Sequence, residues 1–131
     1  MNIIIKKFGG TSVSSIDRIE RAISYIKRTR KSGYFVVVVV SAMGKETDEL
    51  LRLADDVSST HPGREMDMLI TAGERKATAL MCMALHDLGI PADSFTGSQA
   101  GFLTDPTHTN AKILEVRPDR VQDAVDAAIE G

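Results

Sequence analysis

Apolar residues follow two different patterns along this chain. Branched apolar residues form short unbroken runs at positions 3–5 and 35–40, whereas in the stretches after these runs apolar residues recur every three or four positions. Short branched runs are typical of buried strands, and a repeat near 3.6 residues is typical of amphipathic helices. The alternation predicts an α/β fold, with three αβα layers and a mainly parallel central sheet.

Two strands and the helix between them are expected at the start of the chain. Residues 2–6 form the first expected strand. The run at 35–40 has no polar alternation, which is typical of a central strand covered on both faces. The helix between them begins after Ser14 or Ser15, either of which suits an N-cap, and ends at Gly33. Its apolar stripe is Ile16, Ile19, Ile23 and Ile26.

Two more helices are expected after the second strand. The apolar face of the first is Leu50, Leu53, Ala54 and Val57. The second is long, at residues 65–88, and it contains Gly73. A glycine inside a helix costs about 1 kcal/mol relative to alanine. Gly73 therefore indicates close packing or a nearby ligand.

The last third of the chain predicts two further strands and a helix. Residues 90–95 are expected to form a third strand, and residues 111–116 a fourth. The polar stretch at 96–110 is long for a connection, so it either is functional or hides a short strand around Phe102 and Leu103. Pro118 is expected to start the last helix. The apolar side of that helix is Val121, Val125, Ala128 and Ile129.

Composition narrows the classes of function. The chain has 131 residues, of which 43% are hydrophobic, so it is one domain or part of one. Its formal net charge of −2 gives no electrostatic reason to expect a nucleic-acid partner. The longest apolar runs have seven residues, far short of the roughly 20 that a membrane span needs, so no membrane partner is expected. A single cysteine, Cys82, and the lack of a signal pattern fit a reducing cytoplasm.

The turn after the first strand has the chemistry of an anion site. Lys7 lies at the carboxyl end of the strand and is followed by Gly9, Gly10 and a helical pattern. Glycines let backbone N–H groups approach a ligand closely, and the amino terminus of a helix favours negative charge. A plain tight turn explains the same two glycines, so both interpretations stay open at this point.

Three glycine-bearing turns are expected at one rim of the sheet. Residues 7–11, 41–44 and 96–101 each follow a predicted strand, and ligands of parallel sheets gather at the carboxyl ends of the strands. The sequence contains neither GxxxxGK[ST] nor GxGxxG, which counts against a P-loop or a dinucleotide site. The three histidines are scattered and pair with no cysteine or acidic cluster, so no metal site is expected among these residues.

Four motifs, in order and with similar spacing, resemble those of the aspartate kinases. They are KFGGTSV at 7–13, VSAMG at 40–44 with a threonine and aspartate at 47–48, TAGE at 71–74, and SFTGSQAG at 94–101 with a threonine and aspartate at 104–105. The resemblance covers nearly the whole chain, and the first string is specific. It implies the amino-acid kinase fold and transfer of the ATP γ-phosphoryl group to the side-chain carboxylate of aspartate, the first step toward lysine, threonine and methionine.

The same resemblance implies roles for individual residues. Lys7 would neutralise charge on the phosphoryl group during transfer. Ser41 and Thr47 match positions that contact the amino-acid substrate, and Glu74 matches the acidic residue that holds its amino group. Thr47 is explained equally well as the N-cap of the helix that carries Leu50. ATP is expected to act with Mg²⁺ in the complete enzyme. The residues expected to bind phosphate are Gly9, Gly10, Thr11 and Ser12.

The second half of an aspartate kinase, with its nucleotide pocket, has no counterpart in these residues. Residues 1–131 are therefore expected to be the amino-terminal lobe of the catalytic domain and inactive alone. A sheet cut partway leaves an unpaired edge and an uncovered apolar face, so we expect self-association or a complementary kinase half. Two alternatives stay open: a non-catalytic assembly or regulatory module, and a kinase of the same fold that acts on glutamate, carbamate or a nucleoside monophosphate.

Overall fold

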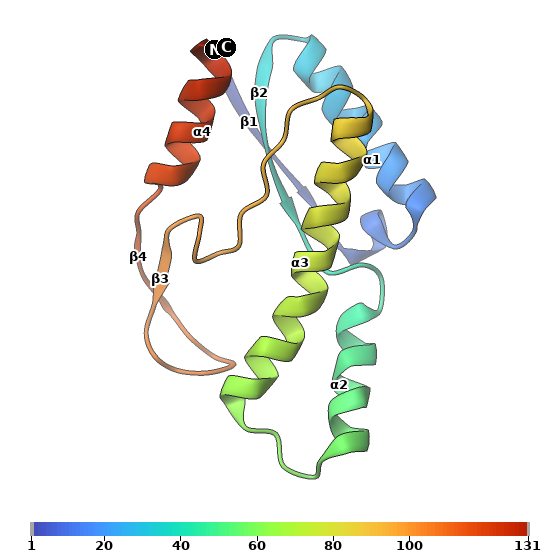
Figure 1. Cartoon of the computed structure of the whole chain (residues 1–131), viewed down its shortest axis with the longest axis vertical. Coiled ribbons are helices and arrows are strands. Elements are labelled where there is room, and N and C mark those ends of the chain that lie inside the picture. The colour runs from blue at the N-terminus through green and yellow to red at the C-terminus, as the bar shows by residue number, and fades with distance from the viewer. Residues whose placement is uncertain (1, 131) are drawn as a thin grey trace.

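Strands and helices alternate in the computed structural model, which describes residues 2–130 (Figure 1). In chain order the elements are β1 (Asn2–Phe8), the 3-10 turn η1 (Gly10–Val13), α1 (Ile16–Lys31), β2 (Tyr34–Val40), α2 (Glu46–Val57), α3 (Gly63–Asp87), β3 (Phe102–Thr104), β4 (Ile113–Val116) and α4 (Asp119–Glu130). The predicted α/β class with a parallel sheet is confirmed.

The parallel sheet consists of β1 and β2. The two strands pair in register, from Asn2 opposite Tyr34 to Phe8 opposite Val40. The connection between them contains α1, because parallel neighbours need a crossover rather than a tight turn. The first strand continues two residues beyond its predicted end, so that Lys7 belongs to the ladder and lies opposite Val39.

The hydrophobic core lies on one face of this sheet. Side chains alternate between the two faces of a strand, and Phe8, Val36, Val38 and Val40 point to the same face. The buried residues packed there come from η1, α1 and α3: Val13, Ile19, Ala22, Ile23, Ile26, Met81 and Leu85. Figure 1 shows α1 and α3 side by side, and the two helices are in contact. Their apolar stripes therefore cover the sheet together.

The opposite face of the sheet is largely open. Ile3 is 50% exposed, Ile5 is 69% exposed and Val39 is 48% exposed. The prediction that the second strand is covered on both faces is therefore wrong, whereas the expected uncovered apolar face is confirmed. The cause is topological, because within residues 2–130 β1 and β2 pair only with each other, so that both are edge strands.

Residues 90–95 do not form the predicted third strand. Pro91 has no N–H to donate to a ladder, and the Ala92 carbonyl oxygen lies 2.7 Å from His86 Nε2. Ile90 and Ala92 instead pack against the core. The apolar residues of this segment therefore indicate burial. The sequence pattern alone does not distinguish a buried loop from a strand that pairs with a neighbour.

The long polar stretch contains the short strand that its length suggested. This strand, β3, pairs antiparallel with β4, with Leu103 opposite Glu115, and the two form a sheet of their own. The last helix, α4, begins directly after Pro118 as predicted. Val125 on this helix is buried, at 4% exposure. The side chain of Ile129 lies outside the described residues.

The start of α1 shows which of two candidate caps is used. Ser15 Oγ accepts a hydrogen bond of 3.2 Å from the N–H of Arg18, so Ser15 is the N-cap. Ser14 Oγ instead donates to the Thr11 carbonyl oxygen at 3.0 Å. Asp17 lies in the first turn, where its negative charge suits the helix dipole.

Two isoleucines of α1 test where the core lies. Ile23 is 4% exposed within the cluster, whereas Ile16 is 61% exposed on the same helix. We expect Ile23→Ala to lower the free energy of unfolding by about 2–5 kcal/mol, through lost burial and a cavity, and Ile16→Ala to change it by less than about 1 kcal/mol. Urea unfolding followed by circular dichroism measures both. Equal losses for the two variants would contradict the described core.

Candidate functional site

Two glycine-bearing turns meet where β1 and β2 end. The N–H of Ser41 donates to the Phe8 carbonyl oxygen at 3.2 Å, which continues the contact between the strands by one residue. The N–H of Gly44 then donates to the Gly10 carbonyl oxygen at 2.9 Å. The predicted rim at the carboxyl ends of the parallel strands therefore exists for these two turns, and backbone hydrogen bonds join them.

Gly10 and Gly9 have different surroundings. A Cβ atom on Gly10 would lie 3.0 Å from the Ala42 carbonyl oxygen and 3.1 Å from that of Gly44. A Cβ atom on Gly9 would meet nothing within 4 Å, and Gly9 has an extended backbone with φ −74° and ψ 174°. Packing therefore explains why Gly10 is a glycine. Gly9 has no such internal reason, and its open side is accessible to a ligand.

The middle of α3 packs against the second turn at Gly73. A Cβ atom on Gly73 would lie 2.9 Å from Glu46 Cγ, 3.2 Å from Leu50 Cδ1 and 3.5 Å from Ala42 Cβ. Close packing therefore explains Gly73. This was one of the two explanations predicted from the sequence. Lys76 Nζ forms an ion pair of 2.9 Å with Glu46 Oε2, which ties α3 to the start of α2.

The expected substrate residues lie around this contact. Glu74 follows Gly73 directly and has an exposed side chain. Ser41, also exposed, precedes Ala42 in the second turn. Thr47 is half-buried in the first turn of α2, whose N-cap is Lys45. The alternative that Thr47 is the N-cap is therefore wrong, because the helix begins two residues earlier than that role requires.

Lys7 projects from the open face of the sheet. Strand alternation places it opposite to Phe8, whose ring is part of the core face. The Lys7 side chain is exposed on this face. Lys6 points to the core face, where its Nζ lies 5.9 Å from the centroid of the Tyr25 ring. Lys7 lies three residues before Gly10, and Glu74 directly follows Gly73. The contacts of these two glycines with Ala42 therefore bring the two segments to the same rim. Within residues 2–130, no ion pair connects their two side chains.

The expected phosphate-binding residues form the start of η1. Ser12 donates its N–H to the Gly9 carbonyl oxygen at 3.0 Å, so this N–H is used within the turn. The carbonyl oxygen of Thr11 accepts the Ser14 hydroxyl, as described above. Gly9, Thr11 and Ser12 are exposed, as an anion-binding turn requires. The first helical N–H groups of such a turn have no partner inside it.

The third glycine-bearing turn is tied to a different part of the molecule. Thr96 N–H donates to Gln99 Oε1 at 2.9 Å, which closes the turn locally. The Gly101 carbonyl oxygen accepts the N–H of Arg117 at 2.8 Å, beside the end of β4. Its hydrogen bonds therefore attach this turn to the β3–β4 hairpin rather than to the first two turns.

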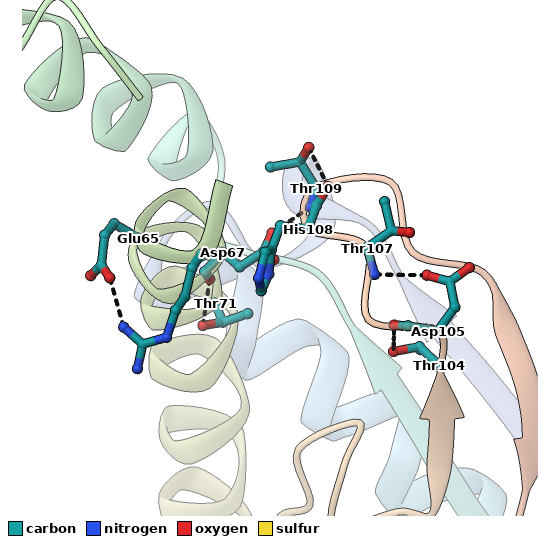
Figure 2. Close-up of polar contacts among 9 residues, drawn as sticks. Glu65, Asp67, Thr71, Thr104, Asp105, Thr107, His108 and Thr109 are labelled. Atoms are coloured by element: carbon teal, nitrogen blue, oxygen red, sulfur yellow. Dashed lines mark hydrogen bonds and ion pairs between the residues drawn. The ribbon is translucent and has the colours of Figure 1, made fainter. Parts of the chain in front are cut away.

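The hairpin loop docks on α3 through one carboxylate, which the sequence did not predict. Asp67 Oδ2 lies 3.0 Å from His108 Nδ1, and Asp67 Oδ1 accepts the N–H of Thr109 at 3.0 Å, as Figure 2 shows. The partners are 41 and 42 residues apart. No short-range pattern reports such a contact, so only the fold reveals it.

The pKa values of two groups outside the rim are shifted. Hydrogen bonds from the backbone N–H of Thr107, with a further one from Lys112, hold the pKa of the Asp105 carboxyl below its usual value. Burial raises the pKa of the Cys82 thiol, and the negative charge of Asp93 raises it further. Cys82 is therefore a weak nucleophile at neutral pH.

Among the described residues, no group of three or more histidine, cysteine or acidic side chains is arranged to hold a metal ion. Across the same residues, none of the helices combines the length and the apolar character that crossing a membrane requires.

Comparison with known proteins places these features in a family. A family model described as the amino acid kinase family matches residues 2–129. The chain belongs to this family. Among the relatives that it resembles, the aspartokinase of Mycolicibacterium smegmatis is 56% identical over 126 residues, and that of Corynebacterium glutamicum is 53% identical over 126 residues.

A solved structure agrees with the sequence comparison. The crystal structure of aspartate kinase from Synechocystis matches with a TM-score of 0.82 and 44% identity, over 97% of this chain and 20% of that chain. The alignments with the two aspartokinases cover 96% of this chain but 30% of each relative. The chain therefore spans less than a third of the length of the relatives that it matches.

The two neighbouring glycines provide a test of the rim. We expect Gly10→Ala to lower the free energy of unfolding by about 1–3 kcal/mol, because its methyl group meets two backbone carbonyl oxygens. Gly9→Ala is the matched control and should be nearly neutral, because its methyl group points into open space. Thermal or urea unfolding measures both. A neutral Gly10→Ala would show that the two turns are not in contact.

Proposed function

We propose that this chain is the amino-terminal lobe of an aspartate kinase catalytic domain. The complete enzyme would transfer the γ-phosphoryl group of ATP to the side-chain carboxylate of aspartate and so form aspartyl 4-phosphate. One observation carries the proposal. The lysine-and-glycine turn after β1, the turn after β2 and the segment of α3 before Glu74 are in contact at one rim, through Gly10, Ala42 and Gly73.

The first turn supplies the groups that phosphoryl transfer needs. The reaction is mostly positioning and stabilisation of charge on the phosphoryl oxygens. Lys7 brings a full positive charge to the end of β1, and Gly9 leaves room for an oxygen close to the backbone. In this proposal Gly10, Thr11 and Ser12 also contribute to the phosphate site, Gly10 by holding the turn against the neighbouring one.

The second turn and α3 supply the groups that suit an amino acid. The Glu74 carboxylate is acceptor-only when ionised and so matches the ammonium group of aspartate. The hydroxyl groups of Ser41 and Thr47 can donate to a carboxylate of the substrate. Both flank the Ala42–Gly73 contact, because Ser41 precedes Ala42 and Thr47 follows Glu46. A combination of both kinds of group suits an amino acid better than a simple anion.

Magnesium is expected with ATP, and among the described residues no group of three or more possible ligands is arranged to hold it. The carboxylates near the rim, Glu46 and Glu74, belong to no cluster of three ligands, and Glu46 is paired with Lys76. Mg²⁺ commonly binds through nucleotide phosphates and one or two carboxylates. We therefore assign no part of the reaction to a metal held by this chain.

The free thiol of Cys82 and the use of ATP suit the cytoplasm as the place of action.

The open sheet face calls for a covering partner. Exposed Ile3, Ile5 and Val39 form an apolar surface on two strands that each have an unpaired edge. We propose that a complementary kinase half covers it, or a second copy of the chain in its absence. A non-catalytic module for assembly or regulation of lysine, threonine and methionine biosynthesis remains the second candidate, which the same open surface favours.

The isolated chain tests the requirement for a second half. We expect a purified polypeptide of these 131 residues to form no aspartyl phosphate from aspartate and ATP, because it covers only 30% of the length of the aspartokinases that it matches, and to gain activity when a complementary kinase half is supplied. A hydroxylamine trap of the acyl phosphate measures turnover. Calorimetry with aspartate separates the two candidates, since a substrate lobe should bind it and a non-catalytic module should not. Turnover by the chain alone contradicts this prediction.

Two adjacent lysines test the role of Lys7. In the complete enzyme we expect Lys7→Ala to lower kcat by about 10²–10³-fold with a modest change in the KM for aspartate, because the charge acts mainly on the transition state. Lys6→Ala is the matched control, since Lys6 points to the other face, with its Nζ 5.9 Å from the Tyr25 ring. Steady-state kinetics measures both. An unchanged kcat for Lys7→Ala removes Lys7 from the mechanism.

A further inference from the structure

One face of α3 carries both a proposed substrate residue and the attachment of the hairpin. Asp67 and Glu74 are seven residues apart, which is nearly two full turns, so their side chains leave the same face of the helix. Thr71 lies between them on this face, one turn from Asp67 (Figure 2). The role proposed for Glu74 does not involve Asp67, although both side chains leave the same face of the helix.

Asp67 uses both of its carboxylate oxygens to hold the hairpin loop. One oxygen faces His108 Nδ1 and the other accepts the N–H of Thr109, each at 3.0 Å. Because an ionised carboxylate only accepts hydrogen bonds, Nδ1 of His108 carries the proton in this contact. The Asp67 side chain is 40% exposed and that of His108 is 52% exposed. An exposed polar contact of this kind contributes little by itself, whether or not the imidazole is charged.

Two further features show that the loop is seated closely. A Cβ atom on Gly63, at the start of α3, would lie 2.7 Å from His108 Cβ, so only glycine allows the loop this near to the helix. Thr109 has a φ of 61°. This conformation is unfavourable for a β-branched residue and persists only where the surroundings hold it. The bond from its N–H to Asp67 supplies such a restraint.

The loop is also braced internally by hydrogen bonds to Asp105. Asp105 Oδ1 accepts the N–H of Thr107 at 2.9 Å, and Asp105 Oδ2 accepts the N–H of Lys112 at 3.2 Å. One side chain thus joins the two ends of the loop. Asp67 then fixes the position of this braced loop relative to α3.

We propose that Asp67 is a positioning residue for the amino-acid site: it holds the Thr107–Thr109 segment against the face of α3 that carries Glu74. This inference rests on the proposed function, because that function gives Glu74 the amino group of aspartate. The hairpin loop then forms one wall of the space in front of α3. Asp67 acts through the loop and does not itself contact the substrate.

The kinetic test uses the complete kinase that contains this chain. We expect Asp67→Ala to raise the KM for aspartate roughly tenfold, with kcat and the KM for ATP changed by less than about twofold, because a misplaced wall weakens binding of aspartate in its ground and transition states alike. Glu65→Ala is the matched control. Glu65 lies on the same turn of α3 but pairs with neighbouring Arg64 at 2.7 Å, away from the hairpin (Figure 2).

Two more variants separate the position of the loop from the charge of Asp67. Asp67→Asn keeps an acceptor for the N–H of Thr109 and should restore part of the aspartate affinity. Gly63→Ala leaves Asp67 intact and favours the helix, yet its methyl group pushes His108 away. It should therefore raise the KM for aspartate in the same way as Asp67→Ala. A normal KM in Gly63→Ala would contradict a role of loop position.

Hydrogen–deuterium exchange gives a readout that does not depend on activity. In Asp67→Ala the amides of residues 105–112 should exchange faster, while those of α1 and β2 should be unchanged. If the wild-type kinase does not phosphorylate aspartate, the proposed function fails. If it does, and Asp67→Ala shows faster exchange with an unchanged KM for aspartate, the positioning role fails. Unchanged exchange in residues 105–112 would show that Asp67 does not hold the hairpin loop.

Discussion

The close approach of three backbone segments at Ala42 is the constraint on which the rest of the structure depends. Gly10 comes within contact of the Ala42 carbonyl oxygen, and Gly73 comes within contact of the Ala42 side chain. Side chains at either glycine would separate the layers, because a packed interior does not absorb an added methyl group without strain. The ends of β1 and β2 and the middle of α3 therefore share one rim, and each predicted site residue lies within a few positions of it.

This packing also explains which features could be predicted from sequence. Apolar runs and repeats located β1, β2, α1 and α3 well, since burial of one face is a local property of the pattern. The same signal failed at residues 90–95, where Ile90 and Ala92 are buried without a neighbouring strand. Periodicity reports which residues avoid water. It does not report whether a second strand is present to accept their backbone hydrogen bonds.

Prediction of the site was limited by distance along the chain. Gly73 could be recognised as a close contact because glycine is costly inside a helix, but its partners on α2 became known only with the fold. Asp67 and His108 are 41 residues apart, and no pattern in the sequence indicates that they are in contact. Thr47 shows a limit of short-range prediction, because the N-cap interpretation depended on a helix boundary that differs by two residues from the observed one.

The position of Lys7 links the chemistry of the site to the unfinished surface of the sheet. Lys7 lies opposite Val39 in the ladder and two residues from Ile5, so it shares the open face with both of these exposed side chains. Whatever segment covers this apolar face must also close over the lysine. Removal of water there strengthens the attraction between its charge and a phosphoryl group. Under the proposed function, completion of the fold and activation of the site would be one event, because the apolar surface that a partner would cover is the surface from which the proposed catalytic charge projects.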